Sequence, residues 1–469
     1  MLIRRADLAL DSRGERGIRD VRITQGIIAA IAPSLQPIGD ELQIDADGGA
    51  LLPGLKDHHI HLMALAAALD SLRCGPPEIG NAEQLAAAIG TAGSGEGWLR
   101  GVGYHESVAG DIDRHWLDRH LWQRPARIQH RSGRLWILNS RALQALGVSD
   151  DDDGKNPCER IDGQLTGRLY DADDWLRQRM QAQRPHLATV SRLLASRGVT
   201  GITDTSHRNG PEDFAFFAAA QARGELLQEA VIMGDARLDA ATDQAHLRRG
   251  ATKFHLHDHA LPDFEQLCAD IRRSHAADRP VAFHCVSRVD LAYALAALGE
   301  SGSLRGDRIE HASIAPPEAI EAMQALGVIV VTQPNFVAER GDTYVDTVDV
   351  QDQPWLYRLQ GFIEAGIPLA GGTDAPYGQP DPWLAMAAAV DRRTRAGRII
   401  GAHEALSPEA ALALFTSPLL NPGQPAPRPH VGARADCCLL TRPWSAQRNR
   451  LADVQVRATL LAGEVIWQS

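Results

Sequence analysis

The chain of 469 residues is too long for one ordinary hydrophobic core, so we expect a large domain together with a smaller one. Hydrophobic residues make up 44% of it, which is typical of a globular protein, and the formal net charge of −11 argues against nucleic acid as a partner. Because no signal peptide opens the chain and no apolar run reaches the roughly 18 residues of a membrane span, we expect a cytoplasmic protein without a membrane partner.

Both ends of the chain have the pattern of short β-strands. Apolar segments separated by turn residues lie at 2–4, 21–23 and 27–31, and again at 435–440, 454–461 and 463–467. The two β-rich ends flank a long middle segment, so we expect them to join in one small sheet domain.

The middle of the chain alternates apolar strands with alanine-rich helices, which is the pattern of an α/β protein with a (β/α)8 TIM-like barrel. Eight candidate strands lie at 51–55, 199–203, 229–233, 252–256, 281–284, 308–311, 328–332 and 367–371. Helices are expected between or after them, for example at 315–326 and 383–391. The segment at about 64–186 is too long for one connection, so we interpret it as an insertion after the first barrel strand. Its acidic run at 150–153 lacks the calcium-loop pattern and is expected to be a solvated loop.

The first barrel strand leads into a histidine cluster. His59 and His61 are spaced i, i+2, and on an extended chain such side chains point to the same side, so the pair can hold one cation. This spacing also arises by chance. It becomes informative because further candidate ligands follow downstream, most of them at the end of an apolar run.

Lys253 lies inside the otherwise apolar strand at 252–256. A buried lysine is costly unless it is paired or chemically altered. Two interpretations stay open at this point. The lysine either lies at the surface of an edge strand, or it is carbamylated by carbon dioxide, and its new carboxylate bridges two cations.

His284, His311 and Asp374 each end an apolar run. Alone, either histidine is typical of a hydrogen-bonded core residue, and the aspartate is typical of a helix N-cap. As a series they favour a metal site, because active sites of (β/α)8 barrels collect at the C-terminal ends of the strands. There Asp374 can contact a cation and a water together, which suits a general base.

Imidazole and carboxylate ligands indicate one or two divalent metal ions. Zinc, iron, manganese and nickel all suit these ligands, and the residue types alone do not rank them firmly; zinc is the metal that we expect first. A bound divalent cation lowers the pKa of its water to about 7, so hydroxide becomes available without a nucleophilic side chain.

With these residues assembled, the chain resembles the amidohydrolase superfamily, and in particular its YtcJ-like branch of metal-dependent hydrolases, which includes N-substituted formamide deformylase. The resemblance covers nearly the whole chain, from the run at 53–61 to the segment at 431–436. The ordered set HxH, Lys, His, His, Asp is specific to the superfamily, and the segments 308–312, 332–334 and 371–374 indicate the branch.

The resemblance implies six metal ligands: His59, His61 and Asp374 at a buried ion, His284 and His311 at a second ion, and carbamylated Lys253 as the bridge. It further implies that Asp374 takes a proton from the attacking hydroxide and delivers it to the leaving nitrogen. The implied architecture is a composite β-sandwich at 1–52 and 427–469 beside a barrel at 53–426.

Four residues are candidates for contact with substrate: Tyr104, Arg134, His257 and Tyr377. Arg134 lies where relatives usually carry an Asp-Gly-His segment, so a group that faces substrate is basic here and indicates an anionic or strongly hydrogen-bonding substrate. By strand alternation His255 and His257 share a face with Lys253, and they either approach the pocket or lie in solvent as loop histidines.

We therefore expect an enzyme that cleaves a C–N bond of a small-molecule amide, cyclic amide or formamide by metal-activated hydroxide. Lactone or ester hydrolysis, or deamination, at the same centre is the alternative, although deaminases of the superfamily typically lack the bridging lysine. A non-catalytic binding protein is disfavoured because such relatives typically lose metal ligands. A homo-oligomer is compatible with all of these interpretations.

Overall fold

The computed structural model describes residues 1–8, 17–92, 97–151, 156–180 and 184–469. They form two compact units, of which one joins residues 1–62 to 187–469 and the other comprises residues 63–186. The acidic run predicted at 150–153 lies partly outside the described residues, and its Asp150 and Asp151 are exposed.

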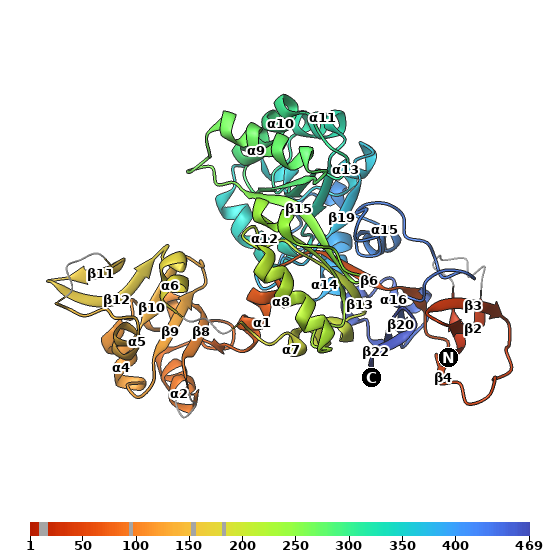
Figure 1. Ribbon diagram of the computed structural model, residues 1–469, viewed down its shortest axis with the longest axis horizontal. Helices are drawn as coiled ribbons and strands as arrows, with labels where there is room; N and C mark the ends of the chain where they lie inside the picture. Colours follow the sequence, from red (N-terminus) through yellow and green to blue (C-terminus); the bar gives the residue numbers. More distant parts are fainter. Residues whose placement is uncertain (9–16, 93–96, 152–155, 181–183) are drawn as a thin grey trace. The chain divides into compact units, whose positions relative to one another are not determined.

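The larger unit is built on an eight-stranded parallel sheet (Figure 1). Its strands, in spatial order, are β6 (Leu55–Ile60), β13 (Val199–Asp204), β14 (Glu229–Gly234), β15 (Leu247–His255), β16 (Val281–Cys285), β17 (Arg308–His311), β18 (Ile329–Thr332) and β19 (Leu369–Gly371). Each neighbouring pair is parallel. Most of their residues are buried, as expected for strands covered on both faces. This sheet confirms the predicted TIM-like barrel.

The barrel closes between its first and last strands through contacts just beyond β19. The Asp374 amide donates to the His59 carbonyl at 2.8 Å, and Thr373 donates to the buried Asp57 carboxylate from its amide at 3.0 Å and from its hydroxyl at 2.6 Å. A Cβ atom at Gly372 would lie 2.4–2.8 Å from atoms of His59, so only glycine allows this approach. The closure places His59 beside Asp374.

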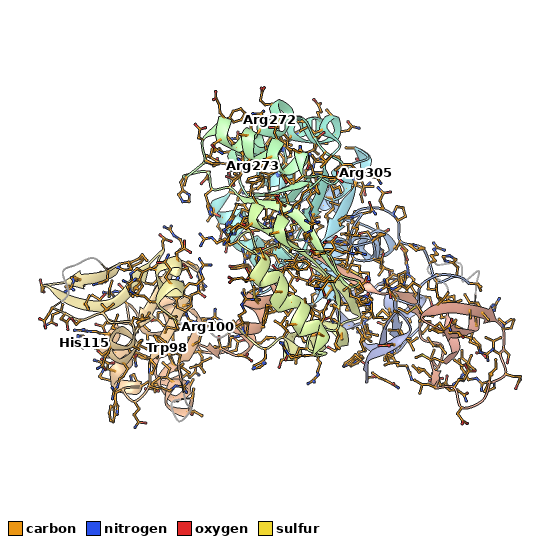
Figure 2. All side chains as sticks on the ribbon, viewed as in Figure 1. Trp98, Arg100, His115, Arg272, Arg273 and Arg305 are labelled. Carbon is orange, nitrogen blue, oxygen red and sulfur yellow. The ribbon has the colours of Figure 1, made fainter. Side chains whose placement is uncertain are left out.

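Helices cover the outside of this sheet (Figure 1). They are α7 (Ala188–Ser196), α8 (Pro211–Ala222), α9 (Phe264–Ala276), α10 (Arg288–Ser301), α11 (Pro317–Leu326), α12 (Asn335–Thr347), α13 (Gln360–Glu364), α14 (Pro382–Asp391) and α15 (Pro408–Leu414). The exposed Arg272 and Arg273 of α9 lie on the outer side of this layer (Figure 2). Among the described residues, no helix combines the length and the apolar character that crossing a membrane requires.

Two four-stranded sheets of the same unit enclose a second core. One consists of β1 (Leu2–Asp7), β2 (Ile18–Thr24), β3 (Ile27–Ala32) and β4 (Gln43–Asp45), and the other of β5 (Leu51–Pro53), β20 (Cys437–Leu440), β21 (Val456–Leu461) and β22 (Glu464–Gln468). Ile3 and Val21 of the first sheet and Leu439 and Leu460 of the second belong to one buried cluster. The limits of this domain, 1–52 and 427–469, stay a prediction.

The predicted strand at 51–55 is wrong. Leu51–Pro53 pairs antiparallel with β20 in a small sheet, and the barrel strand begins at Leu55. The chain passes from one sheet to the other at Gly54, where a Cβ atom would lie 2.4–3.0 Å from the Thr200 side chain. A continuous apolar run does not reveal this change of sheet. The other seven predicted strands are found, with β15 beginning earlier than expected, at Leu247.

The smaller unit holds a six-stranded sheet in the order β11-β12-β10-β9-β8-β7. Its elements are β7 (Leu72–Arg73), α2 (Ala82–Ala92), β8 (Leu99–Tyr104), α3 (Glu106–Ala109), α4 (Arg114–His120), β9 (Ala126–His130), β10 (Leu135–Leu138), α5 (Ser140–Ala145), β11 (Cys158–Ile161), β12 (Gln164–Tyr170) and α6 (Asp173–Arg179). Two buried clusters of its own stabilise this unit.

The substitution Thr373→Val tests the barrel closure. It removes one donor from the buried Asp57 carboxylate, and losing a hydrogen bond to a charged group costs about 1.5–3 kcal/mol. We expect a lower melting temperature of the barrel in scanning calorimetry. Thr347→Val, which removes a hydroxyl from an exposed position, is the control and should change stability by less than about 0.5 kcal/mol. Equal melting temperatures for the two variants would contradict the assignment.

Candidate metal centre

His59 and His61 leave the end of β6 on the same side of the chain. Their Nε2 atoms lie 3.4 Å and 3.3 Å from Asp374 Oδ1. His58 contacts a different neighbour, since its Nε2 lies 2.9 Å from the Ser417 hydroxyl. The structure therefore brings His59, His61 and Asp374 together and leaves His58 out of the group.

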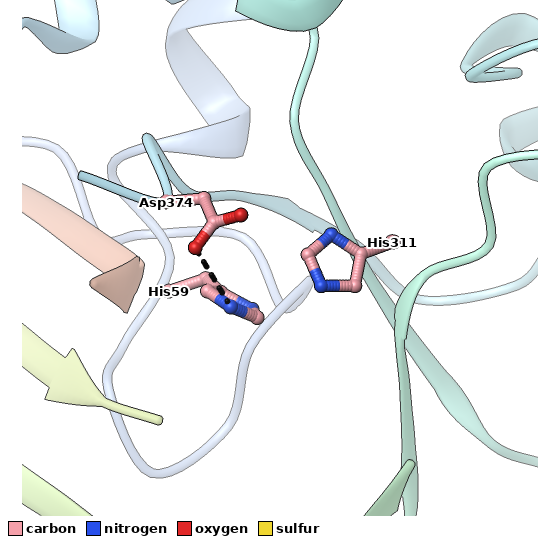
Figure 3. Close-up of side chains that lie close together, drawn as sticks. All are labelled: His59, His311 and Asp374. Atoms are coloured by element: carbon pink, nitrogen blue, oxygen red, sulfur yellow. Dashed lines mark ion pairs between the residues drawn. The ribbon is translucent and has the colours of Figure 1, made fainter. Parts of the chain in front are cut away.

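His311, at the end of β17, completes a tight group with His59 and Asp374 (Figure 3). One ligand atom of each residue lies within 4.8 Å of the other two, and all three side chains are buried. His311 and Asp374 have φ angles of 69° and 53°, a left-handed conformation that costs a non-glycine residue about 1–3 kcal/mol. Such strain persists only where the surrounding structure enforces it, and it is frequent at active sites.

Hydrogen bonds fix the tautomers of two of these imidazoles. His59 Nδ1 lies 2.6 Å from Glu310 Oε2, and His311 Nδ1 lies 2.6 Å from Gln333 Oε1. Because both partner atoms are acceptors, each Nδ1 carries the proton and each Nε2 keeps a lone pair. An acceptor behind the imidazole is typical of histidines that bind metal ions.

Several buried polar atoms around this group have no hydrogen-bond partner among the described residues, and they include Asp374 Oδ1, His311 Nε2 and Lys253 Nζ. Burying a polar atom without a partner is costly, and a cation between Asp374 and His311 would satisfy the first two atoms. Imidazole nitrogens with a carboxylate oxygen are a donor set that suits zinc and related cations. The residues present therefore fit a divalent cation.

Lys253 lies on β15, with its Nζ 3.8 Å from Glu310 Oε1. Burial lowers the pKa of its amine to about 8, and the neutral amine is the form that reacts with carbon dioxide. Glu310 also forms an ion pair with Arg308 at 2.6 Å. In the unmodified protein this single carboxylate offsets the charges of both cationic side chains.

His284 lies outside the tight group. Its ring centroid is 4.4 Å from that of His311 and 4.3 Å from that of His255. The resemblance implies that His311 binds a second ion together with His284, whereas in the structure His311 lies with His59 and Asp374. The geometry thus favours one ion at the tight group, with His284 and Lys253 beside it.

A second group of possible ligands, His105, Glu106 and His130, lies in the smaller unit. Here Nδ1 of each histidine accepts a backbone N–H, from Ser107 at 3.2 Å and from Ser132 at 3.1 Å. Each Nε2 therefore carries the proton and faces the Glu106 carboxylate, at 3.3 Å and 2.9 Å. This tautomer offers no lone pair at Nε2, so the group is a hydrogen-bonded cluster and not a metal site.

The four candidates for substrate contact fall into two sets. Two of them lie beside histidines of the barrel. The ring centroid of Tyr377, which is 56% exposed, lies 5.5 Å from that of His61, and the ring centroid of the exposed His257 lies 6.3 Å from that of His284. Tyr104 and Arg134 instead line a pocket of about 410 Å³ in the smaller unit. Arg134 forms two hydrogen bonds with Asp171 there, so its charge is already paired.

Sequence reasoning missed three residues that position the imidazoles: Glu310, Gln333 and Ser206, whose hydroxyl lies 3.1 Å from His61 Nδ1. Glu310 and Gln333 stand inside segments 308–312 and 332–334, which served only to indicate the branch. The available signal was a carboxylate inside a predicted strand, directly before a candidate ligand, and the structure shows that Glu310 is fully buried.

The amidohydrolase family model matches residues 43–467 of the chain. The chain is 23% identical to the putative amidohydrolase YtcJ of Bacillus subtilis, over 91% of this chain and 90% of that protein. It is 24% identical to N-substituted formamide deformylase of Arthrobacter pascens, over 94% of each. Its fold is similar to that of an uncharacterized metal-dependent hydrolase from Pyrococcus horikoshii, with a TM-score of 0.76 and 17% identity over 97% of this chain and 98% of that one. The resemblance inferred from the sequence is confirmed, and the chain belongs to the amidohydrolase family.

Proposed function

We propose that this hydrolase cleaves the C–N bond of a small-molecule amide, cyclic amide or formamide. The observation that carries the proposal is the buried group of His59, His311 and Asp374 at the C-terminal ends of the barrel strands, where (β/α)8 enzymes have their active sites. The relative named N-substituted formamide deformylase supports formamides as one substrate class.

The residues proposed to hold the cation are His59, His61, His311 and Asp374, with zinc as the first choice. When bound, a divalent cation makes water acidic near neutral pH and polarises a carbonyl oxygen. Glu310 and Gln333 keep the imidazoles of His59 and His311 in the tautomer that offers Nε2. In a form with two ions, His284 and carbamylated Lys253 would supply the additional ligands.

Asp374 is the proposed base and acid. Burial alone would raise the pKa of its carboxyl, but the neighbouring imidazoles of His59 and His61, 3.4 Å and 3.3 Å from Oδ1, hold that pKa well below its usual range. The carboxylate is therefore ionised at neutral pH. It can accept the proton of the attacking water and pass it to the leaving nitrogen, which leaves readily only when protonated.

Deamination is the second candidate. One observation favours it: the tight group is suited to a single ion, and a one-ion centre does not need the bridging lysine that deaminases of the superfamily typically lack. Lactone or ester hydrolysis requires the same residues and stays an alternative. Parallel assays of N-substituted formamides, cyclic amides, lactones and aminated heterocycles on zinc-loaded protein distinguish these reactions. Turnover of lactones alone, or of aminated heterocycles alone, would overturn the amide proposal.

The substitution Glu310→Gln tests the support of His59. It keeps the size of the side chain but removes the charge that holds the Nδ1 proton, so we expect metal affinity to fall about 10–100-fold in chelator competition. Glu321→Gln on the exposed face of α11 is the control. Unchanged affinity in Glu310→Gln would show that the carboxylate does not support a metal ligand.

The substitution Asp374→Asn tests the proton transfer. The amide can still contact a cation, but it cannot accept the proton, so kcat should fall by about 10²–10⁴-fold while bound metal is retained. Metal content is measured by mass spectrometry and compared with the exposed variant Asp349→Asn. Full activity of Asp374→Asn would refute the assigned role.

The substitution Lys253→Ala tests the bridging carbamate. If two ions are bound, the second should be lost first, and short carboxylic acids should partly restore it by occupying the place of the carbamate. Metal stoichiometry with and without added acid is the measurement. One ion per chain in both the parent protein and the variant would establish a one-ion enzyme.

A further inference from the structure

A row of histidines continues from the candidate metal centre to the protein surface. From His311 the ring centroids follow at 4.4 Å to His284, 4.3 Å to His255, 4.3 Å to His257 and 5.5 Å to His259. His311 is 2% exposed, whereas the His259 side chain is 71% exposed. The row therefore connects a buried site with solvent.

The barrel itself builds this row. β17, β16 and β15 are neighbours, and His255 is the register partner of His284 across the parallel pair of β15 and β16. Beyond the end of β15 the chain continues with histidines at every second residue, His257 and His259. Three adjacent strand ends thus place successive imidazoles against one another.

The imidazoles of the middle members of the row have no hydrogen-bond partner among the described residues. Within the described part of the chain, the side chains of His255, His257 and His284 form no hydrogen bond, in contrast to His59, whose Nδ1 is paired with Glu310. Their ring nitrogens are therefore available as ligands. Zn–N bonds are about 2.0–2.1 Å long, so an ion can be held between two imidazoles at these separations after small rotations of the rings.

We propose that His257, His255 and His284 form the entry path of the resident cation, which passes between successive imidazole pairs to the centre at His311, His59 and Asp374. The proposal rests on the proposed function, because that function requires the ion. A path of imidazoles alone suits zinc, nickel and copper ions and not magnesium or calcium ions. The centre adds a carboxylate and further imidazoles, so it binds the ion more tightly than any position along the path.

Isotope exchange on the full-length, zinc-loaded protein tests the path. The protein is incubated with free ⁶⁷Zn²⁺, and the isotope ratio of bound zinc is followed by mass spectrometry after gel filtration. In the double variant His255→Asn, His257→Asn we expect exchange about tenfold slower, the factor that a barrier higher by about 1.4 kcal/mol produces. Total bound zinc should stay the same, because neither residue belongs to the tight group.

Two further variants separate a ligand role from packing. His257→Asp keeps a donor for zinc at the same place and should exchange at nearly the rate of the unmodified protein. His403→Asn removes an exposed histidine outside the row and should have no effect.

Exchange at the unmodified rate in the double variant would overturn the path. So would a loss of total zinc in that variant, because His255 or His257 would then be a ligand of the resident ion. Absence of bound zinc from the unmodified protein after zinc loading would contradict the proposed function itself, and the path with it.

Discussion

The closure of the barrel is the constraint on which the candidate centre depends. His59 and Asp374 are separated by nearly the whole barrel in sequence, and they meet only because the first and last strand segments are held together. The Asp57 carboxylate accepts two hydrogen bonds from Thr373, and the backbone of Asp374 donates to that of His59. Gly372 allows the two segments to approach. The residues that close the fold are thus direct neighbours of the residues that form the site.

Glu310 is the second point on which the site depends. This fully buried carboxylate accepts the His59 Nδ1 proton at 2.6 Å, pairs with Arg308 at 2.6 Å and lies 3.8 Å from Lys253 Nζ. Carbamylation would replace the ammonium of Lys253 with an anion close to Glu310. Two like charges at this separation repel in a buried site unless cations lie between them. A carbamylated Lys253 would therefore need a cation beside it, whereas an unmodified Lys253 would not.

The barrel, and the candidate ligands that lie together at its rim, could be predicted from the sequence because their signals are local. Most candidate ligands end an apolar run, and parallel strands of a barrel end at the same rim. The change of sheet at Gly54 was missed because it depends on the Thr200 side chain, which is distant in sequence. Glu310 was missed for the same reason, since its partner His59 is 251 residues away. The pattern of apolar runs shows which residues lie at the C-terminal rim of the barrel. It does not show which of their atoms face each other across that rim.

The two histidine groups in this chain show that the number of histidines does not define a metal site. In the barrel, an acceptor behind Nδ1 leaves Nε2 as a lone pair, whereas in the smaller unit a backbone N–H behind Nδ1 forces the proton onto Nε2. The difference arises from the neighbours, a carboxylate or amide oxygen in one case and the turn after the histidine in the other. The side chains of His255, His257 and His284 have no hydrogen-bond partner among the described residues. Their nitrogens can therefore offer a lone pair to a cation, as those of the centre do and Nε2 of the cluster in the smaller unit does not. With no donor occupying their nitrogens, these imidazoles can accept a cation, which an imidazole whose Nε2 carries the proton cannot do.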